Sequence, residues 1–275
     1  MSTVQRDILV RDLMTDEVIA CPRHATVASV ASILARREVH AVFVLDDFGR
    51  PSGVLSDFDL IGGEWLADDS ESLETMQNVT AGQLMSAPAE TIGVGETAAV
   101  AASRMRELRV SRLLVTDDNR SAVGVISVSD LIAPLGRLSG ARQIVRDVMS
   151  HAIVTCPPET SLRDAARAMT ERRSRSIVAV DANGRAVGVI TGNDLLSLYD
   201  EQELGATVSD LMSTPITCDP DLPLSEAAYL MISNEVHRLV VTDASRPHGA
   251  PIGIISTSDI VAEMAQAGSV WQDVG

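Results

Sequence analysis

Residues 53–59 read GVLSDFD, a short apolar stretch that ends in a Ser/Thr-x-x-Asp turn. The pattern returns as GVISVSD at 124–130, GVITGND at 188–194 and GIISTSD at 253–259. About 45 residues before the last Asp of each copy lies a methionine in a short polar turn. These methionines are Met14, Met85, Met149 and Met212. A fixed period indicates one supersecondary unit that is used repeatedly and stacked on itself, so this repeat decides the fold.

The first repeat predicts an ordered series of elements. Thr26 is placed as a helix N-cap, and Val27, Val30 and Ile33 follow it at helical spacing. In chain order the repeat predicts a strand at 18–21, a helix at 26–34, a strand at 41–45, a turn at 46–49, a strand at 53–55 and a closing helix after Asp59. The other three repeats predict the same order.

One such unit exposes an apolar sheet face that it cannot bury alone, so adjacent units should pair. We predict an α/β (α+β) fold of four β-α-β-β-α repeats, with repeat one paired to two and repeat three paired to four. The predicted repeats span 8–64, 79–136, 143–200 and 206–266. The acidic stretch 61–79 is interpreted as a solvated extension of a closing helix, and 133–143 as the linker between the pairs.

Charge and composition exclude several classes of function. A net charge of -16 argues against nucleic acid, because affinity for a phosphate backbone rests on clustered cations. All 22 basic residues are Arg, whose planar guanidinium can still bind a small anion locally through two hydrogen bonds. The sequence has no GxSxG, GxxxxGK[ST] or HExxH motif, so it predicts no enzyme. Without an apolar span or a signal peptide at its start, it predicts a cytoplasmic protein.

Three cysteines follow the methionines of repeats one, three and four by six or seven residues: Cys21, Cys156 and Cys218. Repeat two has Ile92 at the equivalent position. Because an isoleucine can replace the thiol, we interpret the position as a buried apolar packing site and predict neither a disulfide framework nor a metal centre.

The pattern resembles the CBS domain, named after cystathionine beta-synthase, in four copies that form two tandem pairs (Bateman modules). The resemblance rests on V-x-D-L/V-M-S/T at 10–15, 145–150 and 208–213, followed by an apolar strand ending in Asp and then by G-h-h-S/T-x-x-D, where h is apolar. Residues 234–241, NEVHRLVV, are similar to part of the gamma subunit of AMP-activated protein kinase. Four-repeat proteins without a catalytic domain, from archaea and bacteria, are the nearest overall match. The resemblance implies a flat disc that binds adenine nucleotides (AMP, ADP or ATP) between paired repeats, with no required cofactor.

The resemblance assigns roles to equivalent positions in each repeat. A carboxylate at the end of the turn can accept bonds from both hydroxyls of a ribose, which implies Asp59, Asp130, Asp194 and Asp259. A hydroxyl three residues earlier is expected to donate to a phosphate beside the amino end of the following helix, which implies Ser56, Ser127, Thr191 and Ser256. A further hydroxyl at the mouth of each cleft is matched by Thr15, Ser86, Ser150 and Ser213. Adenine is expected against the next apolar strand, at Ile19 and Ala20, Glu90 and Thr91, Val154 and Thr155, and Thr217 and Cys218.

The resemblance also implies that cations reach the phosphates from the start of the partner repeat's second strand. The equivalent positions are His40 and Ala41, Ser111 and Arg112, Arg175 and Ser176, and His237 and Arg238. Asp194 would then face His237 and Arg238, the fullest set. Asp59 would face Arg112, and Asp259 would face Arg175. Asp130 would face only His40 and Ala41, so its cleft is predicted to be the weakest.

Several alternatives stay open from the sequence alone. Each Ser/Thr-x-x-Asp turn is also a plain helix N-cap motif. The ligand is either an adenine nucleotide or S-adenosylmethionine, whose positive charge suits the cleft of Asp130. A regulatory protein that signals to an unidentified partner competes with an interaction scaffold whose clefts have decayed. Pairing of CBS modules between two copies would give a homodimer.

Overall fold

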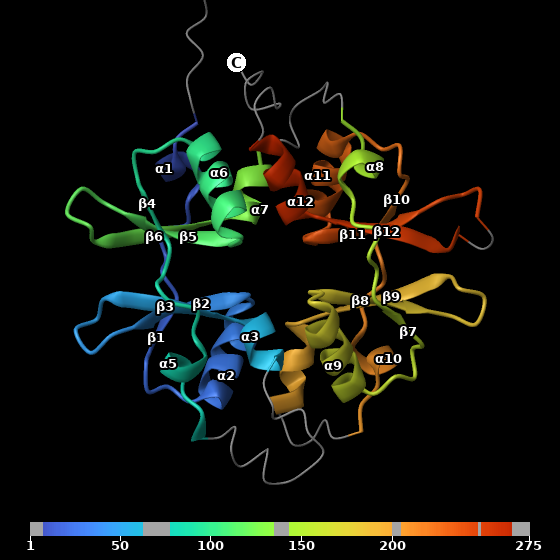
Figure 1. The fold of residues 1–275 in the computed structure, drawn as a ribbon, viewed down its shortest axis with the longest axis horizontal. Helices are drawn as coiled ribbons and strands as arrows, with labels where there is room; N and C mark the ends of the chain where they lie inside the picture. The colour runs from blue at the N-terminus through green and yellow to red at the C-terminus, as the bar shows by residue number, and fades with distance from the viewer. Residues whose placement is uncertain (1–7, 63–77, 135–142, 200–204, 247–248, 266–275) are drawn as a thin grey trace, which may run out of the picture. The chain divides into compact units, whose positions relative to one another are not determined.

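The computed structural model describes residues 8–62, 78–134, 143–199, 205–246 and 249–265. Most of the predicted acidic extension and of the predicted linker between pairs lies outside these ranges. The chain, coloured by residue number in Figure 1, divides into two compact units. Unit 1 is Met1–Val18, Glu90–Ala152 and Ile216–Gly275, and unit 2 is Ile19–Ala89 and Ile153–Pro215. Unit 1 therefore holds the sheets of repeats two and four, and unit 2 those of repeats one and three.

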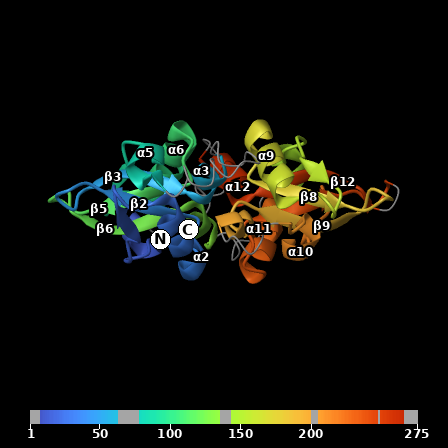
Figure 2. The same ribbon diagram turned by 90° about the horizontal axis from the view of Figure 1, so that it is seen from below.

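Each repeat forms a three-stranded sheet with the same topology (Figures 1 and 2). Its first strand runs parallel to its second, and the second runs antiparallel to the third. In unit 2 the strands are β1 (Ala20–Pro22), β2 (Ala41–Leu45) and β3 (Pro51–Ser56), then β7 (Thr155–Cys156), β8 (Ser176–Val180) and β9 (Ala186–Thr191). In unit 1 they are β4 (Thr91–Gly93), β5 (Arg112–Thr116) and β6 (Ala122–Ser127), then β10 (Thr217–Cys218), β11 (Arg238–Thr242) and β12 (Pro251–Ser256). The predicted mixed α/β class is confirmed.

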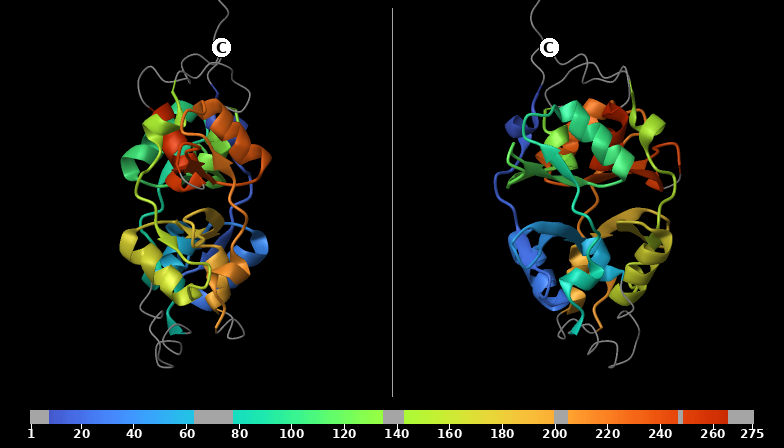
Figure 3. Two further views of the ribbon diagram at one scale, coloured as in Figure 1. Left: turned by 90° about the vertical axis from the view of Figure 1, so that its right-hand side faces the viewer. Right: turned by 60° about the vertical axis from the view of Figure 1, so that its left-hand side comes forward.

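A long helix carries the parallel crossover in each repeat. These helices are α2 (Val27–Arg37), α6 (Ala98–Leu108), α9 (Leu162–Arg172) and α11 (Leu224–Ser233). The predicted N-cap at Thr26 is confirmed, since its side chain accepts a bond from the Ser29 amide. The helix runs three residues beyond the predicted end at Leu34 and stops where Glu38 adopts a left-handed conformation. In each unit the helices cover one face of the two sheets (Figure 3).

Shorter helices open and close each repeat. The opening helices are α1 (Val10–Leu13), α5 (Ala81–Leu84), α8 (Val145–Val148) and α10 (Val208–Leu211). The closing helices are α3 (Asp57–Ile61), α7 (Val128–Ile132), the 3-10 helix η3 (Asp194–Tyr199) and α12 (Thr257–Met264). Among the described residues, no helix is both long and apolar enough to cross a membrane.

The opening segments do not stay with the repeats that they begin. Thr15 pairs with Val125 of repeat two through two backbone bonds, of 2.9 Å from the Thr15 amide and 2.8 Å from the Val125 amide. Ser86 of repeat two pairs in the same way with Val54 of repeat one, and both bonds are 2.9 Å. Repeats three and four exchange their opening segments in the same way. Ser150 of repeat three pairs with Ile254 of repeat four, and Ser213 of repeat four pairs with Val189 of repeat three. Each opening segment therefore pairs with the third strand of the neighbouring repeat.

The glycine that begins each GhhS/TxxD stretch makes this exchange feasible. A side-chain carbon at Gly124 would lie 2.6 Å from the Thr15 carbonyl oxygen and 3.1 Å from the Met14 sulfur. At Gly53 it would lie 2.5 Å from the Met85 sulfur. All three distances are below van der Waals contact, so only glycine leaves room for the methionine segment of the neighbouring repeat. The methionine of one repeat therefore contacts the glycine of its neighbour, as Met14 does with Gly124 and Met85 with Gly53.

The cores show how the repeats pack within a unit. Unit 1 has one continuous core that joins repeats two and four. It includes Met105 of repeat two and Met231 of repeat four. Unit 2 has two clusters, and each takes one side chain from the other repeat. Leu196 of repeat three packs in the repeat-one cluster, and Ile61 of repeat one packs in the repeat-three cluster. Exchanged segments link repeat one to repeat two and repeat three to repeat four. The hydrophobic cores instead join repeat one to repeat three and repeat two to repeat four.

Candidate functional site

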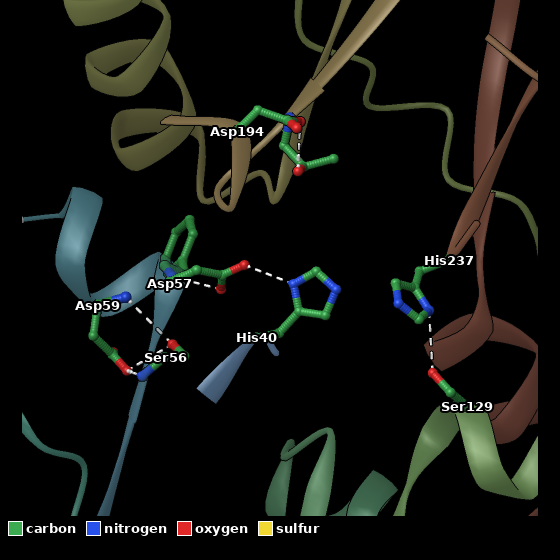
Figure 4. A network of polar contacts seen from close by, with 9 residues as sticks. His40, Ser56, Asp57, Asp59, Ser129, Asp194 and His237 are labelled. Carbon is green, nitrogen blue, oxygen red and sulfur yellow. Dashed lines mark hydrogen bonds and ion pairs between the residues drawn. The ribbon is translucent and has the colours of Figure 1, made fainter. Parts of the chain in front are cut away.

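The four predicted Ser/Thr-x-x-Asp turns have one geometry. In each, the Oδ2 atom of the Asp accepts a bond from the backbone amide of the Ser or Thr and a second from its hydroxyl. For Asp194 both bonds from Thr191 are 2.7 Å, and for Asp59 the bonds from Ser56 are 2.8 and 2.7 Å (Figure 4). Asp130 and Asp259 repeat these contacts with Ser127 and Ser256 at 2.6 to 2.8 Å. In two copies the Asp amide also donates to the hydroxyl as in a helix N-cap, at 3.3 Å for Ser56 and 3.4 Å for Ser256.

This geometry changes the role expected for the hydroxyl. Ser56 and Thr191 donate their protons within the turn, so either would have to give up that bond before it could donate to a phosphate. The Asp side chains are half-buried and rotationally fixed by the cap, and neither cap bond uses their Oδ1 atom. A half-buried carboxylate held in one orientation is suited to accept hydrogen bonds from a sugar hydroxyl.

The exchanged segments determine where the mouth hydroxyls lie. Ser86 sits opposite Val54, two residues before Ser56, and Ser213 sits opposite Val189, two residues before Thr191. In unit 1, Thr15 sits opposite Val125 and Ser150 opposite Ile254. These strand residues again lie two positions before the turn residues Ser127 and Ser256. Each unit thus brings a mouth hydroxyl from one repeat to the turn of the neighbouring repeat. The predicted adenine strands Ile19 with Ala20 and Val154 with Thr155 lie in unit 2, and Glu90 with Thr91 and Thr217 with Cys218 lie in unit 1.

The strand register places two of the predicted arginines beside turns of their own repeats. Arg112 is the direct partner of Ser127, and Arg238 is the direct partner of Ser256. Directly opposed residues of an antiparallel pair present their side chains on the same face of the sheet. The equivalent partners of Ser56 and Thr191 are Ala41 and Ser176. The turn of Asp130, predicted to be poorest in cations, therefore has an arginine within its own sheet.

The predicted sets of one Asp with the cations of another repeat are divided between the units. Asp194 and Thr191 belong to unit 2, whereas His237 and Arg238 belong to unit 1. Within unit 1, the His237 Nδ1 atom lies 3.1 Å from the hydroxyl of Ser129 in repeat two (Figure 4). The combination of Asp194 with His237 and Arg238 stays a prediction.

A second carboxylate in the first turn was missed by the sequence reasoning. Asp57 lies 3.0 Å from the His40 Nδ1 atom through its Oδ2 atom, and its Oδ1 atom accepts a 2.7 Å bond from the Phe58 amide (Figure 4). Burial alone would raise the pKa of Asp57, but the bond and charge of His40, the charge of Arg175 and the Phe58 amide together lower it. Comparing the four turns could have found it, since only GVLSDFD carries two acids.

Two of the three cysteines are buried as predicted. Cys21 and Cys218 are buried like Ile92, Cys156 is half-buried, and all three are free thiols. Burial and the neighbouring charge of Asp219 raise the pKa of Cys218 to about 12, so it stays protonated at neutral pH. Among the residues that the structure describes, no group of three or more His, Cys, Asp or Glu could hold a metal ion.

The repeat architecture, the exchanged segments and the four capped turns define a known family. The pattern of the CBS domain matches residues 10–63, 81–136, 145–201 and 208–266, which is most of the chain. The chain belongs to the CBS domain family, with four CBS domains.

The chain is similar to several uncharacterized proteins and to solved structures of the same fold. The chain is 25% identical over 273 residues to an uncharacterized 33.4 kDa protein in a ribosomal RNA operon of Thermofilum pendens, a match that covers 90% of this chain and 88% of that protein. It is 27% identical over 141 residues to uncharacterized protein MK0525 of Methanopyrus kandleri, covering 50% of this chain and 70% of that one. Among solved structures, protein MJ1225 of Methanocaldococcus jannaschii, described as a candidate archaeal homolog of g-AMPK, superposes with a TM-score of 0.79. That match has 18% identity and covers 92% of this chain and 99% of the other, so it shows the fold.

Proposed function

We propose that the protein is a non-catalytic regulator that binds adenine nucleotides, AMP, ADP or ATP, at its Ser/Thr-x-x-Asp turns and signals their level to a partner protein. Membership of the CBS domain family supports this proposal. The observation that carries it is the repeated turn, in which a half-buried carboxylate is fixed by two bonds from the same Ser or Thr.

The physical argument concerns preorganisation. A ribose presents neighbouring hydroxyls, and a carboxylate oxygen accepts them without first having to be ordered, because the cap has already fixed the side chain. Asp194 is oriented by Thr191 at 2.7 Å in both bonds. Ser, Thr or Asn at the cap position stabilises a helix start without needing an acid. An acid three residues later also completes a capping box, so capping and ligand binding make different predictions only on ligand titration.

The cations decide which turns bind phosphate most tightly. From the sequence, Asp194 is ranked first because His237 and Arg238 are both assigned to it, and Asp130 is ranked last. The strand register supports a different assignment of the cations, in which Arg112 provides the positive charge for the turn of Asp130 in the same sheet. The two assignments make opposite predictions for Asp130, and mutation can separate them.

Calorimetric titration of the full chain with AMP, ADP, ATP, S-adenosylmethionine and GTP tests the proposal. We expect an adenine nucleotide to bind below millimolar concentration. Asp194→Ala is expected to abolish the tightest site and Asp130→Ala to change little, with Asp164→Ala, an exposed acid in the N-cap turn of α9, as control. Equal losses from Asp194→Ala and Asp130→Ala would refute the ranking. If no adenosyl compound binds, the proposed function is wrong and a scaffold role replaces it.

A further inference from the structure

Helix α6 of repeat two carries an exposed apolar stripe on the side that faces away from the core. Its inward residues, which include Ala98, Ala101 and Met105, are buried in the core that joins repeats two and four. On the outer side, Val100 is 43% exposed and Leu108 is 42% exposed. Residues eight positions apart lie on the same side of a helix. Helix α6 is therefore apolar on two sides, and the outer side is open to solvent.

The other three crossover helices have polar residues at the positions of Val100 and Leu108. The equivalent residues are Ser29 and Arg37 in α2, Asp164 and Arg172 in α9, and Glu226 and Asn234 in and directly after α11. All six are exposed, and the helix forms in every repeat. The fold therefore does not require an apolar residue at either position. Two exposed apolar side chains on one stripe, where the equivalent helices are polar, are typical of a contact surface.

The outer side of α6 is hollowed and carries one charge of each sign. An open hollow of about 540 Å³ is lined, among the described residues, by Ala99, Val100, Ser103, Arg104, Glu107 and Leu108. The Arg104 guanidinium lies 4.0 Å from the Glu90 carboxylate, but its side chain is 46% exposed and can reach a second acid. Arg104 and Glu107 cancel each other, so the stripe is neutral in a chain whose net charge is -16.

The order of these residues along α6 makes the stripe complementary to itself. If two copies of α6 pack antiparallel about a two-fold axis near position 104, Val100 of each copy meets Leu108 of the other. Arg104 of each copy then lies about one helical turn from Glu107 of the other, within reach of an ion pair. Ser103 is small enough to let the two helix axes approach to roughly 8–10 Å. Two chains of like charge repel each other elsewhere, so a neutral stripe favours contact between copies.

We propose that the outer stripe of α6 is the interface through which two copies of this chain form a two-fold symmetric dimer. The observation that identifies a second copy as the partner is the self-complementary order of apolar and charged residues. The inference does not rest on nucleotide binding, because the stripe uses none of the capped turns. Each copy contributes a single helix, so the interface is small and the dissociation constant is expected to be roughly 10–100 µM.

Sedimentation equilibrium of the full chain, from roughly 1 µM to 1 mM, tests the dimer. Leu108→Arg installs the residue that α2 and α9 carry at this position, and it is expected to raise the dissociation constant about tenfold or more. Val100→Ser, which installs the α2 residue, should act in the same direction and serves if Leu108→Arg unfolds. Tyr229→Arg on α11 is the matched control, because this side chain is also exposed, and it should leave the dimer unchanged.

Cross-linking tests the antiparallel two-fold arrangement. Ser103→Cys places a thiol beside the proposed axis, so a short bismaleimide should join two copies. Arg167→Cys, at the equivalent position of α9, is the matched control and should stay a single chain. Equal cross-linking of both variants, or none in a Ser103→Cys protein that sediments as a dimer, would refute the arrangement.

Two sedimentation results would overturn the proposed interface. A wild-type chain that stays monomeric up to about 1 mM would show that a second copy does not occupy the stripe, and would leave it to a different protein. A dimer that Tyr229→Arg disrupts and Leu108→Arg does not would place the contact on α11. Nucleotide titration of the same monomeric variants distinguishes this failure from a failure of the proposed function, because the two make no use of each other's residues.

Discussion

Replacing Gly124 by alanine should detach the exchanged segment of repeat one from repeat two. The added methyl group would meet the Thr15 carbonyl oxygen at 2.6 Å and the Met14 sulfur at 3.1 Å. The carbonyl cannot move alone, since it accepts a 2.8 Å bond from the Val125 amide and the Thr15 amide returns a 2.9 Å bond to Val125. Relief of the clash therefore costs packing and both backbone bonds.

The magnitude follows from these contacts. Overpacking a close contact costs about 1–3 kcal/mol, and each lost backbone bond costs about 0.5–1.5 kcal/mol. The alanine recovers about 0.4–1 kcal/mol by restricting the unfolded chain. We expect Gly124→Ala to lower the free energy of unfolding of unit 1 by about 1–6 kcal/mol.

Urea unfolding followed by circular dichroism, together with amide hydrogen exchange at Val125, measures both parts of this prediction. The Val125 amide should exchange faster in Gly124→Ala than in the wild type. Gly95→Ala is the matched control, because a side-chain carbon there meets nothing within 4 Å. If the two variants unfold within about 0.5 kcal/mol of each other and Val125 stays protected, the proposed role of the glycine is wrong.

Three further predictions follow from the same contacts. In Gly188→Ala the added carbon would clash with the Sδ, Cγ and Cβ atoms of Met212, and adding Met212→Ala removes the first two, so it should recover about 1–2 kcal/mol of the loss in a double-mutant cycle. The pKa of Asp57 is lowered from 3.8, so its charge stabilises the fold above that pH and this stabilisation is lost as the pH falls through the lower folded pKa. Urea midpoints between pH 6 and 3 should therefore fall more steeply for the wild type than for Asp57→Asn. The Cys218 thiol, with its pKa raised to about 12, should react with a thiol reagent only after unfolding.

Each of these predictions has a contradicting result. Additive losses in the Gly188 and Met212 cycle would mean that the two side chains do not share one space. Parallel pH profiles for the wild type and Asp57→Asn would mean that the His40 contact does not favour the charged carboxylate. Labelling of Cys218 in the folded protein at the rate of the urea-unfolded protein would show that its burial does not protect it.

The sequence predicted local structure well because caps and periodicity act over a few residues. Thr26 caps the helix that its position predicts, and the Cys-to-Ile replacement in repeat two identified a buried site that Cys21 and Ile92 both occupy. The candidate carboxylates were found because four copies of one turn reinforced each other. The second acid, Asp57, was within reach of the same comparison, but its partner His40 lies 17 residues away.

The sequence by itself determined the repeating unit, its element order and the family, since a fixed period and recurring motifs are properties of the chain. The tertiary structure decided which copies touch. A period does not say whether Met14 packs on its own repeat or the next, whereas the pairing of Thr15 with Val125 and the space at Gly124 show that the segment is exchanged. Nor does a period show that the Arg175 guanidinium lies over the Phe58 ring of another repeat. Four equivalent motifs become unequal sites because burial, register and charge depend on neighbours distant in sequence.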